Sequence, residues 1–322
     1  MIIESAIILV IALIMSLLIL GLERKIQARI QQRYGPPLTT PGLWSALKFM
    51  HKENVRPDSP NPAMYHLFLL AGLAATALIL LFTTPPWYGF LGFASLLGIA
   101  GLLKVEEATY LFMGSFSRSV MSESMPYPDI LKGAKEEGVR SFFEDVAAVR
   151  SLKMITLGSF PYYVALILPF AAAGSMDVAT VLSGKPAIFT ITGAFMAFIY
   201  FMGFNIIANN RPFDIIKPKV DIMEGPWMEY AATWRALTYV MKGFVMFTLS
   251  SVFVTLYLGV PLDVNNANTA AVHLALALVM PILAAILKAY SPVLTFKQIY
   301  PISYKLTVAG LVALAVNVMG VL

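Results

Sequence analysis

Long apolar segments are the feature that most restricts how this chain can fold. A helix needs roughly 20 predominantly apolar residues to cross the hydrocarbon core of a bilayer, and the chain contains eight segments of this kind. They lie at about residues 2–22, 64–83, 88–112, 154–173, 187–208, 237–259, 269–287 and 302–321. Because helices satisfy their backbone hydrogen bonds internally in lipid, we predict an all-α, polytopic transmembrane bundle that forms a single domain over residues 1–322.

The composition supports a membrane protein and excludes several kinds of site. Hydrophobic residues make up 58% of the chain and charged residues only 13%, whereas a soluble domain carries about 25% charged residues. Cysteine is absent, which excludes disulfides and any zinc ion or iron–sulfur cluster held by cysteines of this chain. The three histidines, His51, His66 and His273, lack the spacing of a metal site. We therefore expect neither a cofactor nor a metal in this chain.

The first apolar segment has two interpretations, a cleaved signal peptide or a retained helix. A signal peptide begins with a basic region and ends at a small-residue cleavage site. Here the acidic Glu4 stands where a basic residue would be expected, and no such cleavage site precedes Arg24. We therefore expect the segment to remain as the first transmembrane helix.

Basic residues are concentrated in alternate connections between the apolar segments. Of the 23 lysines and arginines, all but Lys104 and Lys185 lie in or beside the first, third, fifth and seventh connections. Because cytoplasmic loops are enriched in lysine and arginine, these connections are predicted to face the cytoplasm, and both termini to lie outside the cell membrane. This topology also accounts for the net charge of +5, so we expect no nucleic-acid partner.

The predicted cytoplasmic connections are long, whereas the outer ones are short and nearly uncharged. They cover about residues 24–62, 113–152 and 209–236, and the second is predicted to be a cytoplasmic insertion that contacts a partner subunit. Since these loops mix both signs of charge, they suit a docking surface for soluble subunits better than a simple lipid-binding patch.

The first cytoplasmic connection starts with a basic run, in which residues 23–37 read ERKIQARIQQRYGPP. If the first helix continues through this run, Arg29 and Arg33 lie on one face, and the Gly-Pro-Pro sequence ends the helix. The apolar stripe within residues 42–51 predicts a short amphipathic helix along the membrane surface. A basic anchor with no further role is the simpler interpretation of this loop.

Three further runs lie next to the later spans. Residues 210–215 read NRPFDI, and residues 224–230 read EGPWMEY. Residues 150–161, which lead into the fourth apolar segment, read RSLKMITLGSFP.

Together these runs resemble the membrane subunit that lies beneath the peripheral arm of respiratory complex I and recurs in energy-converting membrane-bound hydrogenases and their sulfane-reducing relatives. The double proline at 36–37 and the EGP-x-x-EY run are similar to the hydrogenase and sulfane reductase branch rather than the complex I branch. The resemblance covers most of the chain except about 120–148. It implies the eight-helix fold and a non-catalytic membrane anchor of a redox-driven ion pump.

The resemblance also implies the partners of the chain. Iron–sulfur and hydrogenase-like subunits are expected on the cytoplasmic face, antiporter-like subunits within the membrane, and ferredoxin as the electron donor of the complex. Iron–sulfur clusters, and in the hydrogenase branch a nickel–iron centre, are expected in those partner subunits. The docking candidates are basic residues on the cytoplasmic side: Arg24, Lys25, Arg29, Arg33, Arg150, Arg211, Lys217 and Lys219.

The chain departs from the family where the resemblance implies a relay of carboxylates. Family members carry acidic residues after the Phe-Asp-Ile run, whereas residues 217–219 of this chain read KPK and are followed by the shorter Asp221. Ser159 stands where the family has a glutamate. In the family these carboxylates line a hydrated funnel thought to link redox chemistry with ion movement. We therefore expect the two lysines to weaken that relay.

Lys104, Glu106 and Glu107 carry charge within the third predicted span. A charge at the bilayer centre costs about 2.5–3.5 kcal/mol, so such residues usually face the protein interior and pair. Lys104 and Glu107 are three residues apart and can pair on one helix face, whereas Glu106 points elsewhere. If these residues instead lie near the cytoplasmic end, snorkelling makes them inexpensive. We take all three as candidates for an ion path.

The remaining polar and aromatic residues are less informative. Acidic residues of the fifth connection join the ion-path candidates through the resemblance: Asp214, Asp221, Glu224 and Glu229. Lone polar groups within the spans have no catalytic or ligand spacing, so we expect packing or hydrogen-bonding roles for Asn205, Lys242 and His273. The tryptophans fall near predicted membrane interfaces, where an aromatic belt accounts for them: Trp44, Trp87, Trp227 and Trp234.

Two functions of different classes remain. The first is the membrane anchor of a ferredoxin-linked, ion-translocating complex that reduces protons or a sulfur species. An alternative within this class is the quinone-site subunit of a complex I-type dehydrogenase. The second is a stand-alone secondary transporter, which predicts internal symmetry and a polar midplane site on broken helices. The sequence shows neither feature. Because no nucleophile, metal-ligand set or nucleotide loop is visible, we expect the electron chemistry in partner subunits.

Overall fold

The regular secondary structure is helical in the part of the chain that the structure describes. The computed structural model describes residues 1–322 except 58, 60, 90–92, 118–141, 219–221 and 320–322, and the described residues contain no β-strand. Lys219 and Asp221, and the larger part of the predicted insertion at 113–152, lie outside the described residues.

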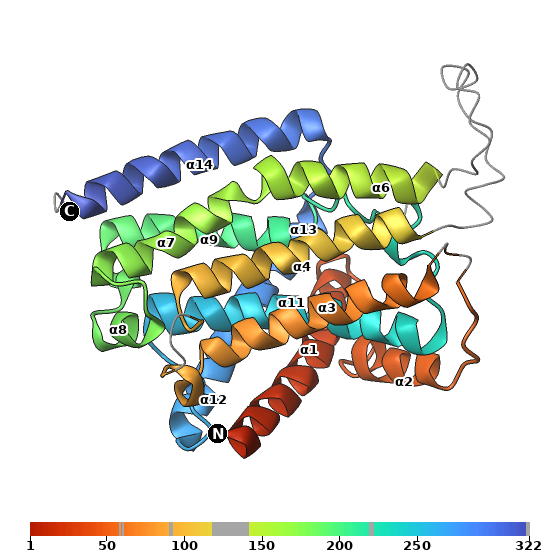
Figure 1. Ribbon diagram of the computed structural model, residues 1–322, viewed down its shortest axis with the longest axis horizontal. Coiled ribbons are helices and arrows are strands. Elements are labelled where there is room, and N and C mark those ends of the chain that lie inside the picture. Colours follow the sequence, from red (N-terminus) through yellow and green to blue (C-terminus); the bar gives the residue numbers. More distant parts are fainter. Residues whose placement is uncertain (58, 60, 90–92, 118–141, 219–221, 320–322) are drawn as a thin grey trace.

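A helix occupies the place of each of the eight predicted spans (Figure 1). These helices are α1 (Ile2–Ile30), α3 (Pro62–Phe82), α4 (Leu96–Phe116), α7 (Phe160–Ala173), α9 (Ile191–Ile207), α11 (Ala232–Leu258), the pair α12 (Ala267–Ala277) and α13 (Val279–Tyr290), and α14 (Phe296–Val318). Within the described residues, six helical stretches are long and apolar enough to cross a membrane. The other two helices are not among these six: α9 is apolar but has only 17 residues, and α4 has 21 residues but contains three charged ones. The predicted all-α, multi-pass architecture is confirmed.

Most of these helices run side by side along the long axis of the molecule, and α1 crosses them at an angle (Figure 1). The most buried long helix is α11, which packs against α1, α3 and α12. At one edge, α14 packs against α7 and α9. Helix α1 begins and α14 ends toward the end of the bundle that carries α8 (Val178–Ser183) and α12.

The first helix is longer than its apolar segment but shorter than the basic run suggested. It continues to Ile30 and ends where Gln32 adopts a φ of 58°, in the left-handed region. Arg33 therefore lies beyond the helix. The helical face predicted to be shared by Arg29 and Arg33 is wrong, because the backbone turns before the glycine and prolines are reached.

The short helix predicted at 42–51 is present. It consists of a π-helical turn, η1 (Thr40–Trp44), followed by α2 (Ser45–Met50), and these segments pack against α1 and α11. Ala46 is buried, whereas Leu43 and Met50 are exposed. This division is expected when one face of a helix meets protein and the other meets the membrane surface.

The third and fourth spans begin differently from the prediction. Helix α4 starts at Leu96 rather than near 88, because the Ser95 hydroxyl caps it by accepting a hydrogen bond from the Gly98 amide at 3.2 Å. Helix α6 (Phe142–Lys153) and the π-helical turn η4 (Met154–Gly158) lead directly into α7 (Figure 1). Part of the predicted insertion is therefore a helix that packs against α4.

Gly243 allows α1 and α11 to approach closely. A Cβ atom built on Gly243 would lie 2.2 Å from the carbonyl oxygen of Ser16, which is shorter than any van der Waals contact. Small residues at such crossings bring helix backbones together in membranes. The position of α1 against the centre of the bundle therefore depends on the absence of a side chain at this position.

Gly243→Ala is expected to destabilise the protein by about 1–3 kcal/mol or more, because the added methyl group meets backbone that cannot rotate away. The thermal unfolding midpoint of the detergent-solubilised protein measures this effect. Gly101→Ala in α4 is the matched control, since nothing lies within 4 Å of the corresponding Cβ position. Equal midpoints for the two variants would contradict the close crossing.

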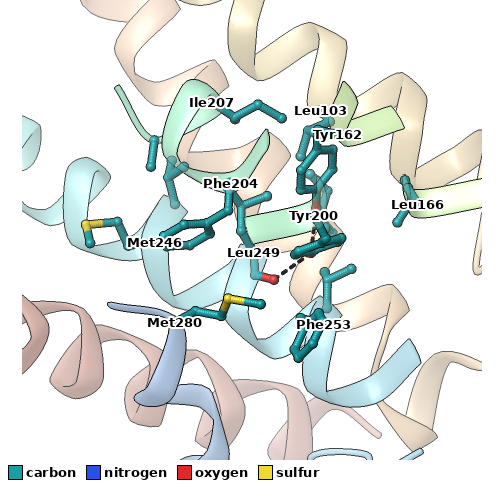
Figure 2. Packing of buried hydrophobic residues seen from close by; sticks show 14 of the residues in the cluster. Leu103, Tyr162, Leu166, Tyr200, Phe204, Ile207, Met246, Leu249, Phe253 and Met280 are labelled. Atoms are coloured by element: carbon teal, nitrogen blue, oxygen red, sulfur yellow. Dashed lines mark hydrogen bonds between the residues drawn. The ribbon is translucent and has the colours of Figure 1, made fainter. Parts of the chain in front are cut away.

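A pair of tyrosines joins three helices in the middle of the bundle (Figure 2). The hydroxyls of Tyr162 in α7 and Tyr200 in α9 lie 2.7 Å apart, and the Tyr200 hydroxyl donates to the carbonyl of Leu249 in α11 at 2.7 Å. Both rings are fully buried. Because buried hydroxyls are costly unless they are hydrogen-bonded, these contacts fix the relative positions of α7, α9 and α11.

Candidate functional site

Lys104 and Glu107 form an ion pair where α4 meets the start of α7. Lys104 Nζ lies 2.7 Å from Glu107 Oε2, and it also donates to the Ser159 hydroxyl at 2.9 Å and the Ile155 carbonyl at 3.0 Å. The Ser159 hydroxyl donates in turn to Glu107 Oε2 at 3.2 Å. The pair predicted from the spacing on α4 is therefore present, with Ser159 as its bridge to α7.

Glu106 lies on another side of α4 and is fully buried. Among the described residues, neither of its carboxylate oxygens has a hydrogen bond of regular geometry. The groups that interact with it are Glu107, Lys217 and the hydroxyl of Tyr110, one turn along α4. A buried carboxylate without regular hydrogen bonds is costly, and such residues at membrane depth usually serve a function.

The connection between α9 and α11 folds back into the bundle instead of covering its surface. Phe213, Ile215 and Ile216 are buried. Arg150 of α6 donates to the Ile215 carbonyl at 3.3 Å, so this predicted docking residue ties α6 to the connection. These contacts bring Lys217, which follows the buried apolar residues, against α4.

Lys217 is buried between two aromatic rings, with 7% of its surface exposed. Its Nζ lies 3.7 Å from the centroid of the Trp227 ring and 4.8 Å from that of Tyr110. Nζ also donates to the Tyr110 hydroxyl over 3.5 Å. Attraction between the ammonium group and the ring faces offsets part of its lost hydration.

Two predictions are corrected by this arrangement. Lys217 is an interior residue, so it does not lie on the surface where docking was predicted for it. Trp227 is 6% exposed and belongs to the same interior contact, so its assignment to an aromatic belt is wrong. Both errors have the same cause. The burial of Lys217 and Trp227 depends on contacts between the connection and α4, and the local sequence pattern does not indicate such contacts.

The surroundings of Lys217 shift its protonation equilibrium. Burial, followed by the repulsion from Lys242, lowers the pKa of Lys217 to about 7. Three carboxylates act in the opposite direction and favour the ammonium form: Asp214, Glu106 and Glu224. Near neutral pH, both the ammonium and the neutral amine of Lys217 are therefore populated.

A cavity of about 390 Å³ lies beside this connection. Its wall is formed by α1, the residues that follow α1, the connection between α9 and α11, α11 itself and α13. The charged side chains in the wall are mostly basic: Glu23, Arg24, Arg33, Arg211, Asp214, Lys217, Glu224, Arg235, Lys242 and Lys288. The cavity therefore suits a polar or anionic occupant better than a neutral apolar one.

Glu23 joins three helices at the wall of this cavity. One of its carboxylate oxygens accepts a hydrogen bond from Lys288 of α13, and the other lies 4.0 Å from Lys242 of α11. Gln27 donates to Glu23 at 3.2 Å, and Glu23 is buried. Removing one partner from such a buried cluster leaves an uncompensated charge.

Several residues of the site were not identified from the sequence. Tyr110, Glu23 and Lys288 were not candidates, and Lys242 was interpreted as an isolated polar group, which is wrong because it faces Glu23 across the cavity wall. A usable signal existed for Lys242, since an ionisable residue inside a predicted span usually has a partner or a function. Arg235, also not a candidate, pairs with Glu224.

The other predicted candidates divide between the surface and the cavity. Four of the predicted docking residues are exposed: Arg24, Arg29, Arg33 and Arg211. Lys25 is half-buried. The acidic candidates of the connection are half-buried, and the first two of them line the cavity: Asp214, Glu224 and Glu229. In the described part of the chain, no group of histidine and acidic side chains is placed to hold a metal ion.

A second and much smaller cavity lies behind the contact between Lys217 and Tyr110. It has a volume of about 20 Å³, and Glu107, Tyr110, Ser159 and Asn209 are among its lining residues. A space of this size holds one water molecule. Glu107 Oε1 and Asn209 Oδ1 are buried without a hydrogen-bond partner among the described residues, so both can bond to a water at this position.

Comparison with known proteins gives the family and supports the fold. The sequence profile of the NADH dehydrogenase family matches residues 3–319. An uncharacterized protein of Methanocaldococcus jannaschii is 42% identical over 301 residues, which cover 93% of this chain and 92% of that protein. A subunit of the NADH-quinone oxidoreductase of Brucella ovis is 27% identical over 268 residues, 80% of this chain and 74% of that protein.

A solved structure shows the same fold. One chain of the membrane-bound sulfane sulfur reductase, an archaeal respiratory membrane complex, superposes on this chain with a TM-score of 0.80. The match covers 98% of both chains, at 20% sequence identity. The overall arrangement of the helices is therefore shared between the two proteins.

Proposed function

Since this chain belongs to the NADH dehydrogenase family, we propose that it is the non-catalytic membrane anchor of a ferredoxin-linked, ion-translocating respiratory complex. As a multi-pass membrane subunit of the complex I type, it docks the hydrophilic redox arm and couples electron transfer to the movement of H⁺ or Na⁺. In this proposal the complex lies in the plasma membrane, and both termini of the chain face outward.

The line of buried charge from the large cavity to the middle of α4 carries this proposal. Lys217 lines the cavity and interacts with Glu106, which is followed by Glu107 and its ion pair with Lys104. Ionisable groups are expensive at membrane depth and are retained there chiefly for function. A chain that served only to hold partners would not need this line, so it supports a role in coupling.

The exposed basic residues around the cavity support the docking role. Arg24, Arg33 and Arg211 are exposed and line the cavity, where carboxylates of a soluble subunit can pair with them. We propose iron–sulfur and hydrogenase-like subunits as these partners, with antiporter-like subunits beside the chain in the membrane. Ferredoxin is the proposed donor because the proline pair and residues 224–230 are similar to the hydrogenase and sulfane reductase branch. The clusters, and a nickel–iron centre where protons are the acceptor, reside in those partners.

A quinone site is the second candidate function. The Brucella relative is named for quinone reduction, and the volume of about 390 Å³ falls in the range of small-molecule pockets, about 300–1,000 Å³. Such pockets are lined predominantly by apolar side chains, whereas charged residues from five segments line this cavity. We therefore place the quinone function second.

Mild detergent extraction followed by native electrophoresis tests the proposal. The chain is expected to migrate in an assembly that contains iron and acid-labile sulfide. A chain that migrates alone, without iron–sulfur partners, would contradict the anchor function and favour a stand-alone transporter. A spectrum of the purified assembly then separates the acceptors, because a nickel–iron centre indicates proton reduction and its absence indicates a sulfur species or quinone.

A further inference from the structure

We propose that Lys217 carries protons between the large cavity and the Glu106–Glu107 pair, through the hydroxyl of Tyr110. This inference rests on the proposed function, because it assigns one residue to the coupling path within it. The relay expected from the family has a carboxylate after the Phe-Asp-Ile run, where this chain has a lysine. The position therefore keeps a titratable group but reverses the sign of its charge.

The position of Lys217 supports this role. Lys217 and Trp227 line the large cavity, whereas Tyr110 and Glu107 line the small one. The contact of 3.5 Å between Lys217 Nζ and the Tyr110 hydroxyl therefore joins a residue that lines the large cavity to one that lines the small cavity. The Tyr110 hydroxyl interacts in turn with the carboxylate of Glu106. The amine, the phenol and the carboxylate thus follow one another from the cavity toward the membrane interior.

Charged and titratable groups face Lys217 from each element packed around it. They are Glu106 and Tyr110 of α4, Lys242 of α11, and Asp214 and Glu224 of its own connection. The ring of Trp227 in η6 (Gly225–Trp227) covers the remaining side. Because burial and Lys242 oppose the ammonium while the carboxylates favour it, the pKa of Lys217 lies near 7. A group that accepts and then donates a proton works best when its pKa is close to the operating pH.

Each transfer conserves protons and charge. The Tyr110 hydroxyl accepts a proton from the Lys217 ammonium and passes its own proton to a carboxylate oxygen of Glu106. A neutral amine and a carboxylic acid remain. The amine then takes the next proton from a hydronium ion of the solvent in the large cavity, which leaves a water molecule. Because the Trp227 ring attracts only the ammonium form, it favours this reprotonation and resets Lys217 for another transfer.

Substitution by arginine and by methionine separates proton transfer from charge. Lys217→Arg keeps a positive charge but cannot release its proton in the working pH range. Lys217→Met keeps an unbranched side chain of similar length without any titratable group. For the assembled complex in sealed vesicles, we expect both variants to translocate at least roughly tenfold less charge per electron, because neither side chain can take up and release the proton. Oxidation of reduced ferredoxin should change by less than about twofold.

A third variant gives a readout that a purely structural role would not affect. Lys217→Glu restores a titratable group with a lower reference pKa. We expect it to recover part of the charge translocated per electron, with the pH dependence moved to lower pH. Lys185→Met is the control for substitution of a lysine by methionine, because Lys185 is exposed and lies far along the chain from the site.

Several outcomes would overturn the assignment of Lys217. Full coupling in Lys217→Arg would show that the residue supplies only a fixed charge, and full coupling in Lys217→Met would show that it has no role. If neither variant assembles on native gels, Tyr110→Phe decides, since it removes only the hydroxyl. Unchanged coupling in Tyr110→Phe would then exclude the path. Failure of the unmodified complex to translocate charge would instead contradict the proposed function itself.

Discussion

Replacing Glu107 by glutamine is expected to lower the charge translocated per electron by roughly 100-fold, within the range that a positioned proton donor or acceptor contributes. Glutamine keeps the size of the side chain and an oxygen that can accept from Lys104 and Ser159, which lie 2.7 and 3.2 Å from Glu107 Oε2. It cannot take up or release a proton at this position. Electron transfer should stay within about twofold, because the redox centres are expected in partner subunits.

The measurement compares a potential-sensitive dye signal with ferredoxin oxidation in the same sealed vesicles. Asp177→Asn serves as the matched control, because Asp177 is an exposed acidic residue just before α8. Normal charge translocation in an assembled Glu107→Gln complex would remove Glu107 from the path. Loss of assembly without a change in coupling among the remaining complexes would show that the ion pair with Lys104 is structural.

Glu23→Gln is expected to destabilise the chain by about 3–5 kcal/mol, the usual cost of removing one partner from a buried ion pair. Glu23 is the carboxylate that lies between Lys288 and Lys242, so the substitution leaves two ammonium groups facing each other at the cavity wall. We expect most of the assembled complex to be lost on native gels, and a lower thermal unfolding midpoint for what remains.

A double variant tests the physical reason for this loss. Adding Lys288→Met to Glu23→Gln removes one of the unpaired charges, so it should restore part of the stability. Glu53→Gln is the control, since Glu53 is exposed. Normal stability of Glu23→Gln, or a double variant that is less stable than the two single changes predict, would show that the pair contributes little.

The helical architecture could be predicted because it depends on local properties of the chain. Apolar segments of sufficient length must become helices in lipid, and each predicted span has its helix. The predicted helix boundaries were wrong where a single residue determines where the helix begins or ends. Ser95 starts α4 by capping it, and Gln32 ends the first helix by adopting a positive φ. Neither choice changes the hydropathy pattern from which the spans were derived.

The site could be predicted only where its contacts are local. Lys104 and Glu107 pair because three residues of one helix separate them. Lys217 and Trp227 were misplaced because their burial depends on how the connection folds against Tyr110 of α4. The cluster around Glu23 joins residues that are far apart in the chain, and sequence spacing contains no information on such pairs.

The cluster around Glu23 also has a consequence for the biosynthesis of the chain. Glu23 and Lys288 are separated by 265 residues, and chains are inserted from the N-terminal side during synthesis. Among the described residues, the remaining cation near Glu23 before α13 enters the membrane is Lys242, at 4.0 Å. A nascent or truncated chain that stops before α13 therefore carries a poorly neutralised carboxylate in its interior. The cluster around Glu23 is therefore complete only when α13 is in place.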